Sequence, residues 1–208
     1  MRLSGWTAMM CVAVLTIACN TRDRSRYDET TTITESASPA GTSGQAARAA
    51  GADAELFATQ AMMASEAEVK LGKLAEERAQ SPAVKEFAQM MVRDHTNGLN
   101  ALKQAVKGYD INEPSQLDAK HQALYDRLSK LNGAAFDRAY MAAMVEGHQQ
   151  VKNMIDDRVE ESPTATGTSG GATDNSPLAA SVNQWATKAL PTVTQHLQKA
   201  EQIKSQLK

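Results

Sequence analysis

Residues 82–106 read PAVKEFAQMMVRDHTNGLNALKQAV, and this stretch decides the fold. Its apolar residues recur at alternating spacings of three and four: Val84, Ala88, Met91, Leu99, Leu102 and Val106. That spacing places them on one face of an α-helix whose other face is polar. Pro82 suits the first turn of a helix and Gly108 suits its end, so we predict a helix between these two residues. A single ionisable residue, His95, interrupts the apolar face near its middle.

The same periodicity marks the rest of the chain beyond residue 52. We predict helices over residues 53–80, 82–108, 117–131, 134–161 and 177–208. Asn132 and Gly133 separate the third helix from the fourth, and the low-complexity residues 162–176 form a loop before the last. Pro191 lies inside the last helix, where we expect it to kink or restart the helix. The fold class is therefore predicted to be all-α, with long helices packed as a bundle.

The N-terminal residues have the pattern of an export signal. Arg2 supplies a positive charge, and residues 6–18 form an apolar stretch too short to span a bilayer. We therefore predict a signal peptide over residues 1–18. Cys19 follows the small residue Ala18, as in a lipobox, so Cys19 is predicted to carry a lipid as the new N-terminus. Cleavage by an ordinary secretory route near this cysteine is the alternative.

The segment that follows is predicted to be a tether. Residues 19–52 are rich in Thr, Ser, Ala and Gly and show no apolar period, which is typical of disordered chain. A lipid on Cys19 would attach it to a membrane, and Asn20 favours the outer membrane of a bacterial envelope. The folded domain is then predicted over residues 53–208. With a net charge of −2 and 4% aromatic residues, nothing points to a nucleic-acid partner. A protein partner and association between copies of the chain are left open.

Several strings in this domain jointly resemble a known family. They are EVKLGKLA (68–75), VKEFA (84–88), MVRDH (91–95), FDRAYM (136–141), MVEGH (144–148), and Leu190-Pro191 with His196-Leu197. The chain thereby resembles domain-of-unknown-function family 4142, bacterial envelope proteins with a ferritin-like helical bundle. This resemblance implies a ferritin-like four-helix bundle with a short crossover helix over residues 117–131, but it lends no settled activity. Di-iron ferritin-like proteins use Glu-x-x-His on two helices, and that motif is absent at these histidines, so ferroxidase chemistry has no support.

Each of the four long helices carries one ionisable residue on its apolar face: Glu68, His95, His148 and His196. In a ferritin-like arrangement, at about 1.5 Å per residue, Glu68 and His95 lie about 20 Å from the turn at Ser81. By the same measure His148 and His196 lie about 21 Å and 18 Å from that end of the bundle. All four residues are therefore expected to meet in one inward-facing layer.

Three interpretations of this layer stay open at the level of sequence. The groups could satisfy one another by hydrogen bonds and fix the register of an Ala-rich bundle. They could instead bind a Zn, Cu or Fe ion, for which three imidazoles and a carboxylate are competent ligands. Acid–base catalysis is the third interpretation. Asp94 is expected to lie at the surface or to support a ligand, and His121 is expected to have a packing or surface role.

The sequence therefore predicts an exported envelope protein that is most simply a non-enzymatic binding or structural bundle. A metal-dependent redox enzyme of the ferritin-like type is the alternative. No Ser-His-Asp set, Cys-His pair or phosphate-binding glycine loop occurs in a suitable context, so hydrolases and nucleotide enzymes have no support.

Overall fold

The computed structural model describes residues 42–160 and 176–207, and these residues are helical apart from their turns and loops. The helices are α1 (Thr42–Arg78), α2 (Pro82–Ala105), α3 (Ala119–Ser129), α4 (Gly133–Glu160) and α5 (Pro177–Gln206). Within the described ranges, none of these helices has the length and apolar character that crossing a membrane requires. The prediction of an all-α fold is confirmed.

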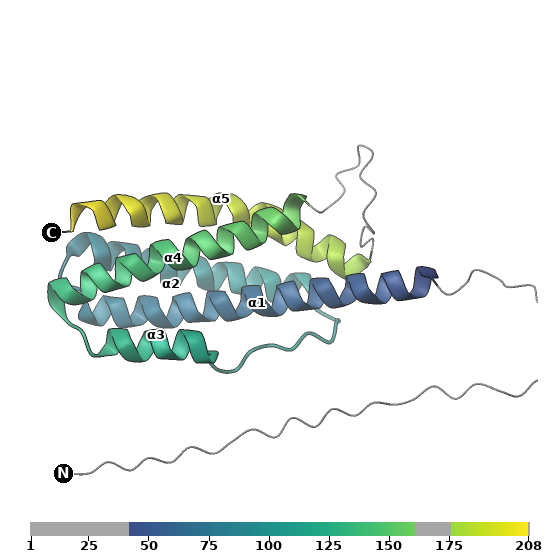
Figure 1. Ribbon diagram of the computed structural model, residues 1–208, viewed down its shortest axis with the longest axis horizontal. Coiled ribbons are helices and arrows are strands. Elements are labelled where there is room, and N and C mark those ends of the chain that lie inside the picture. Colours follow the sequence, from purple (N-terminus) through teal and green to yellow (C-terminus); the bar gives the residue numbers. More distant parts are fainter. Residues whose placement is uncertain (1–41, 161–175, 208) are drawn as a thin grey trace, which may run out of the picture. The chain divides into compact units, whose positions relative to one another are not determined.

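Four long helices form the bundle, and α3 lies beside it (Figure 1). Helix α1 packs along α2, and α4 packs along α5, so consecutive long helices form two antiparallel hairpins. Helix α2 also contacts α5, while α1 contacts both α4 and α5. The short α3 lies against α1 and α4, within the long connection that leads from α2 to α4. This is the four-helix bundle with a crossover helix that the family resemblance implied.

The start of α1 differs from the prediction. The helix begins at Thr42, so the predicted start at Asp53 was too late, and residues 42–52 are not part of a disordered tether. Residues 46–50 read AARAA, and alanine has the highest helix propensity, so this stretch favours helix although its sequence shows no apolar period. Among the described residues, the first buried residue of the core is nevertheless Ala54, next to the predicted helix start at Asp53. The predicted signal peptide and the earlier part of the tether lie outside the described residues.

Gly108 and Pro191, the two residues expected to interrupt helices, act differently. Helix α2 ends close to the predicted position, because Gly108 adopts a φ of 94° that a helix cannot contain. Helix α5 instead continues through Pro191 from Pro177 to Gln206, so the predicted restart does not occur. The chain bends along this helix without leaving the helical conformation (Figure 1).

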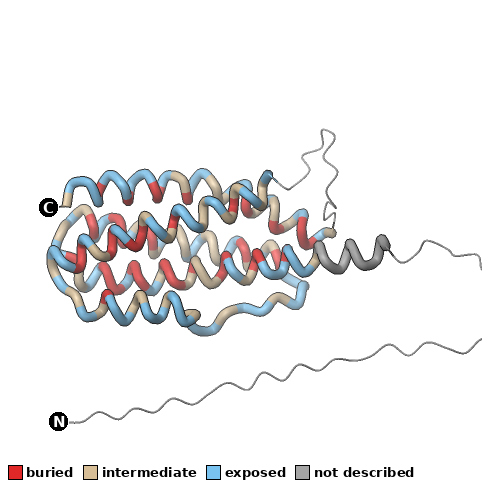
Figure 2. The backbone as a smooth tube through the Cα atoms, viewed as in Figure 1, coloured by how far each residue is buried: buried red, intermediate tan, exposed pale blue. Residues whose placement is uncertain are grey.

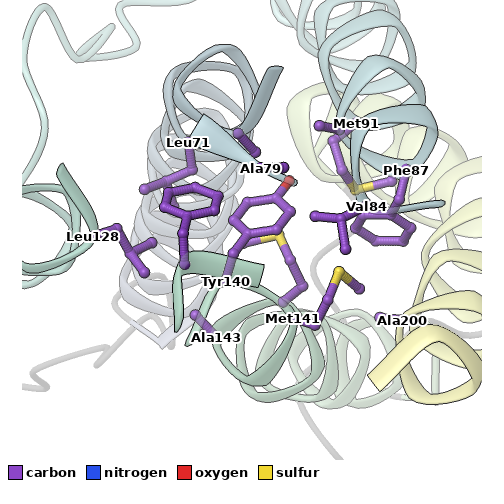
Figure 3. Close-up of a cluster of buried hydrophobic side chains, with 14 of the residues drawn as sticks. Leu71, Ala79, Val84, Phe87, Met91, Leu128, Tyr140, Met141, Ala143 and Ala200 are labelled. Carbon is purple, nitrogen blue, oxygen red and sulfur yellow. The ribbon is translucent and has the colours of Figure 1, made fainter. Parts of the chain in front are cut away.

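The core consists of two apolar clusters with a polar layer between them. Buried residues follow the inward faces of the long helices (Figure 2). The first cluster surrounds Tyr140 near the α1–α2 turn, and Figure 3 shows Phe87 and Met141 pointing into the same space. The second cluster, around Phe57, occupies the other end of the bundle. The buried polar residues between the clusters are Ser65, Glu68, His148 and His196.

One further buried polar residue, Asp137, holds the α1–α2 turn from the neighbouring helix α4. Its side chain is 3% exposed. Its Oδ1 accepts a hydrogen bond from the backbone N–H of Gln80 at 3.0 Å, and its Oδ2 accepts one from Ser81 at 2.8 Å. These two N–H groups precede α2 and would otherwise lack a helical partner, so Asp137 ties the first hairpin to the second.

Candidate metal site

Three histidines from three helices converge in the polar layer. His95 lies on α2, His148 on α4 and His196 on α5. One ring nitrogen from each lies within 4.8 Å of the other two. The closest pair is His95 Nε2 and His148 Nε2, which are 3.4 Å apart. We call these three residues the histidine triad.

The triad is enclosed on most sides. His148 and His196 are 2% and 3% exposed, whereas His95 is half-buried. The three rings face one another with centroids 5.4–5.5 Å apart. The ring of Phe87, from the first apolar cluster, lies edge-on to His148 at 6.4 Å. The triad therefore lies in a weakly solvated environment, and His95 is its most exposed member.

Two of the imidazoles are oriented by acceptors that lie outside the triad. His148 Nδ1 donates to the backbone oxygen of Met144 at 2.9 Å, and His196 Nε2 donates to Oδ2 of Asp94 at 3.1 Å. A neutral imidazole carries one proton, so these bonds assign lone pairs to His148 Nε2 and His196 Nδ1. Metal-binding histidines are commonly held in this way, with the second nitrogen donating to a carbonyl or carboxylate.

Asp94 acts as an ionised acceptor in this arrangement. Partial burial by itself would raise the pKa of Asp94, but hydrogen bonds from Arg93 and His196 bring that pKa below its usual value. Arg93 donates from Nε to Oδ1 at 2.8 Å and from Nη2 to Oδ2 at 3.3 Å. Asp94 thus has the supporting position that the sequence suggested, and its partner is His196 rather than its neighbour His95.

Burial keeps the triad neutral. It lowers the pKa of His148 to about 4 and lowers the pKa of His95 and His196 as well. The pKa of His95 and that of His148 are lowered further, because a proton on one ring repels a proton on its neighbour. At neutral pH the rings are therefore unprotonated at one nitrogen, which is the form that binds a metal ion.

Glu68 lies beside the triad. Its Oε1 is 3.9 Å from His148 Nδ1, and its ligand atoms are not among those that converge within 4.8 Å. Burial raises the pKa of Glu68 to about 8, and its Oε2 has no hydrogen-bond partner among the described residues. The structure therefore brings three of the four sequence-predicted residues together and places the carboxyl on the Nδ1 side of His148.

The remaining sequence candidates lie elsewhere. His121 belongs to α3, where its Nδ1 pairs with Oδ2 of Asp118 at 2.6 Å, in keeping with the expected packing or surface role. Cys19, the predicted lipidation site, lies outside the described residues. Sequence reasoning did not find the role of Trp185, whose Nε1 donates to the backbone oxygen of Gly98 at 3.0 Å and joins α5 to α2. The sequence did not predict this hydrogen bond, because an indole on the apolar face of a helix indicates packing alone.

Comparisons with known proteins give a family and a remote structural likeness. A family model described as Domain of unknown function (DUF4142) matches residues 38–203. A solved structure of the DUF305 protein from Streptomyces coelicolor aligns with 71% of this chain and 92% of its own, at 16% identity and a TM-score of 0.45. No curated protein matches the sequence. None of these findings assigns a role to the triad.

Proposed function

We propose that this chain, which belongs to the family described as Domain of unknown function (DUF4142), binds one transition-metal ion through the histidine triad. The observation that carries the proposal is the convergence of three ring nitrogens, one from each histidine, within 4.8 Å of one another. His196 Nδ1 is buried and has no hydrogen-bond partner among the described residues. A metal ion would occupy the space toward which these nitrogens converge.

A hydrogen-bonded layer accounts for the same residues less well. Such a layer would pair every buried donor and acceptor, yet Glu68 Oε2 and His196 Nδ1 have no partner among the described residues. The contact between His95 and His148, at 3.4 Å, is longer than an ordinary N–H···N or N–H···O bond. Each unsatisfied buried group costs about 1–3 kcal/mol, so a purely structural layer would be a poor one.

The spacing of the nitrogens suits a metal ion. Two imidazole nitrogens bound to one tetrahedral Zn²⁺ at about 2.0–2.1 Å would lie about 3.3–3.4 Å apart. His95 Nε2 and His148 Nε2 already have this separation, at 3.4 Å. Small rotations of the side chains would bring the remaining nitrogens, which lie within 4.8 Å, to the same spacing. Imidazole ligands suit Zn, Cu and Fe, so the experiment has to compare these metals.

The test is a metal titration of the mature, untagged protein. After treatment with a chelator, the protein is titrated with Zn(II), Cu(I), Cu(II) and Fe(II) against a competing indicator, and bound metal is measured by elemental analysis. We expect one ion per chain for at least one of these metals, and loss of that ion in His148→Leu and His196→Leu. His121→Gln, which changes a histidine outside the triad, should bind as the wild type does. Absence of stoichiometric binding for all four metals would refute the proposal.

We also propose that the protein works in the bacterial envelope, held to the outer membrane by a lipid on Cys19. The support is the sequence alone, namely the apolar stretch before a small residue and this cysteine. Cell fractionation tests it: Cys19→Ala should move the protein from the membrane fraction to the soluble periplasmic fraction. Mass spectrometry of the mature N-terminus should find an acylated Cys19, and an unmodified N-terminus at another residue would contradict lipidation.

A further inference from the structure

A cavity of about 760 Å³ opens against the histidine triad. All three histidines line it, together with residues of α1, α2, α4 and α5. This volume lies within the range of about 300–1,000 Å³ that is common for small-molecule sites. A metal bound by the triad would therefore face a space large enough for a second ligand.

The triad also leaves a coordination position open. Among the described residues, no carboxylate or thiol joins the three nitrogens within 4.8 Å. Asp94 bonds to His196 and Arg93, and Glu68 lies on the Nδ1 side of His148. Sites with three protein ligands keep a fourth position for water or a substrate, whereas structural sites fill all four. An external ligand could thus reach the metal from the cavity.

The charges around the cavity favour an anion. Arg93, Lys188 and Lys199 line the cavity, and its acidic lining residues are Asp94 and Glu68. Even with both carboxyls counted as ionised, the lining carries one net positive charge. Neutral imidazoles leave the charge of a divalent ion uncompensated, so the site as a whole would be strongly positive.

One part of the cavity wall is apolar, while Ser65, Asn97, Thr192 and Gln195 line other parts of it. Val151, Ile155 and Trp185 line it beside the triad. The indole N–H of Trp185 is engaged by the backbone oxygen of Gly98, and its ring packs edge-on to Phe57 at 6.3 Å. Trp185 therefore offers the cavity a fixed apolar surface. A ligand that fills this space would have an anionic end near the metal and an apolar body along this wall.

We infer that the cavity binds a short-chain aliphatic carboxylate, with its carboxylate at the open metal position and its alkyl chain along Val151, Ile155 and Trp185. This inference rests on the proposed function, because the metal supplies the anchor for the carboxylate. The exposed Lys188 and Lys199 at the rim attract the anion, and the apolar wall selects for chain length.

The experiment uses protein loaded with Co(II), whose visible absorption reports a change of ligand at the metal. Acetate, butanoate and hexanoate are titrated, and azide serves as an inorganic anion. We expect each carboxylate to change the spectrum, with an affinity that rises about fourfold for each added methylene until the wall is covered. The double variant Lys188→Gln/Lys199→Gln should bind about threefold to tenfold more weakly. Lys204→Gln, on the same helix but away from the cavity, should bind as the wild type does.

Failure of this inference can be told from failure of the proposed function. If Co(II) and the other metals do not bind in a triad-dependent way, the proposed function fails before any carboxylate is added, and this inference fails with it. If the metal binds but carboxylates leave the spectrum unchanged, only the inference is overturned. Equal affinity for acetate, hexanoate and azide would also overturn it, since the apolar wall would then have no role.

Discussion

Two buried carboxyl groups, Asp137 at the α1–α2 turn and Glu68 beside the histidine triad, have opposite surroundings in the same bundle. Asp137 is 3% exposed, and both of its oxygens accept backbone hydrogen bonds, at 3.0 and 2.8 Å. Glu68 is 8% exposed, its Oε1 is 3.9 Å from His148 Nδ1, and its Oε2 has no hydrogen-bond partner among the described residues.

Asp137 is thus a polar group that stabilises the fold, whereas the carboxyl of Glu68 remains available for another partner. A buried carboxylate with two good hydrogen bonds contributes to stability, whereas a buried group without partners destabilises the fold. The same contrast holds for His148 Nδ1, which bonds to Met144, and His196 Nδ1, which has no partner among the described residues. Removing the turn carboxylate should therefore damage stability, and removing groups of the triad should chiefly damage binding.

The largest effect is expected for Asp137→Ala. The change leaves the backbone N–H groups of Gln80 and Ser81 without their acceptor, and we expect a loss of about 3–5 kcal/mol in the free energy of unfolding. Urea denaturation of the metal-free protein measures it. The exposed Glu146→Ala, on the same helix, should change stability by less than about 0.5 kcal/mol. A loss below about 1 kcal/mol for Asp137→Ala would contradict its role at the turn.

The next effect is the stability that the metal adds. At a free metal concentration one hundred times Kd, binding should raise the free energy of unfolding by about 2.7 kcal/mol. His148→Leu and His196→Leu should lose nearly all of this increment, whereas any Asp137 variant that still folds should keep it. Thermal melting with and without metal decides the matter. An increment that survives both histidine substitutions would place the metal elsewhere in the chain.

The helices and their apolar faces could be predicted from the sequence, because apolar periodicity and the helix-ending residues Pro82 and Gly108 are local signals. The convergence of His95, His148 and His196 could be predicted because each interrupts the apolar face of its helix at the same depth in the bundle. The place of Glu68 could not, since a difference of a few ångströms depends on rotamers rather than on spacing. The role of Asp137 was also missed, because the partners of a cap from another helix are not adjacent in sequence.

A smaller effect is expected for Asp94→Ala, which removes the acceptor that orients His196. Loss of such a supporting group lowers metal affinity by about 10- to 100-fold, and the triad itself stays intact. Competition titration measures the affinity. Stability of the metal-free protein should also fall, by about 1–3 kcal/mol, because the buried Nε2–H of His196 loses its acceptor. Glu86→Ala, an exposed acid on the same helix, is the matched control. Unchanged affinity in Asp94→Ala would show that its bond to His196 does not support the site.

The smallest effect concerns how stability of the metal-free protein depends on pH. Burial raises the pKa of Glu68 from 4.5 in the unfolded chain to about 8 in the folded protein. It lowers the pKa of His148 from 6.5 to about 4, and lowers those of His95 and His196. Between pH 4.5 and 6.5 the unfolded histidines bind protons that the folded ones do not, and these outnumber the single proton held by folded Glu68. Stability should therefore rise with pH over this window.

Above about pH 7 the difference reverses. The unfolded histidines are then mostly neutral, but folded Glu68 keeps a proton that the unfolded chain has lost, up to its pKa of about 8. Stability should fall over this window by at most about 1.4 kcal/mol for each pH unit. Glu68→Gln has no such proton, so its stability should not fall between pH 7 and 8. Urea denaturation of both proteins across this range gives the comparison. A wild-type curve that fails to fall below that of Glu68→Gln over this range would mean that Glu68 is not held in the poorly solvated position that distinguishes it from Asp137.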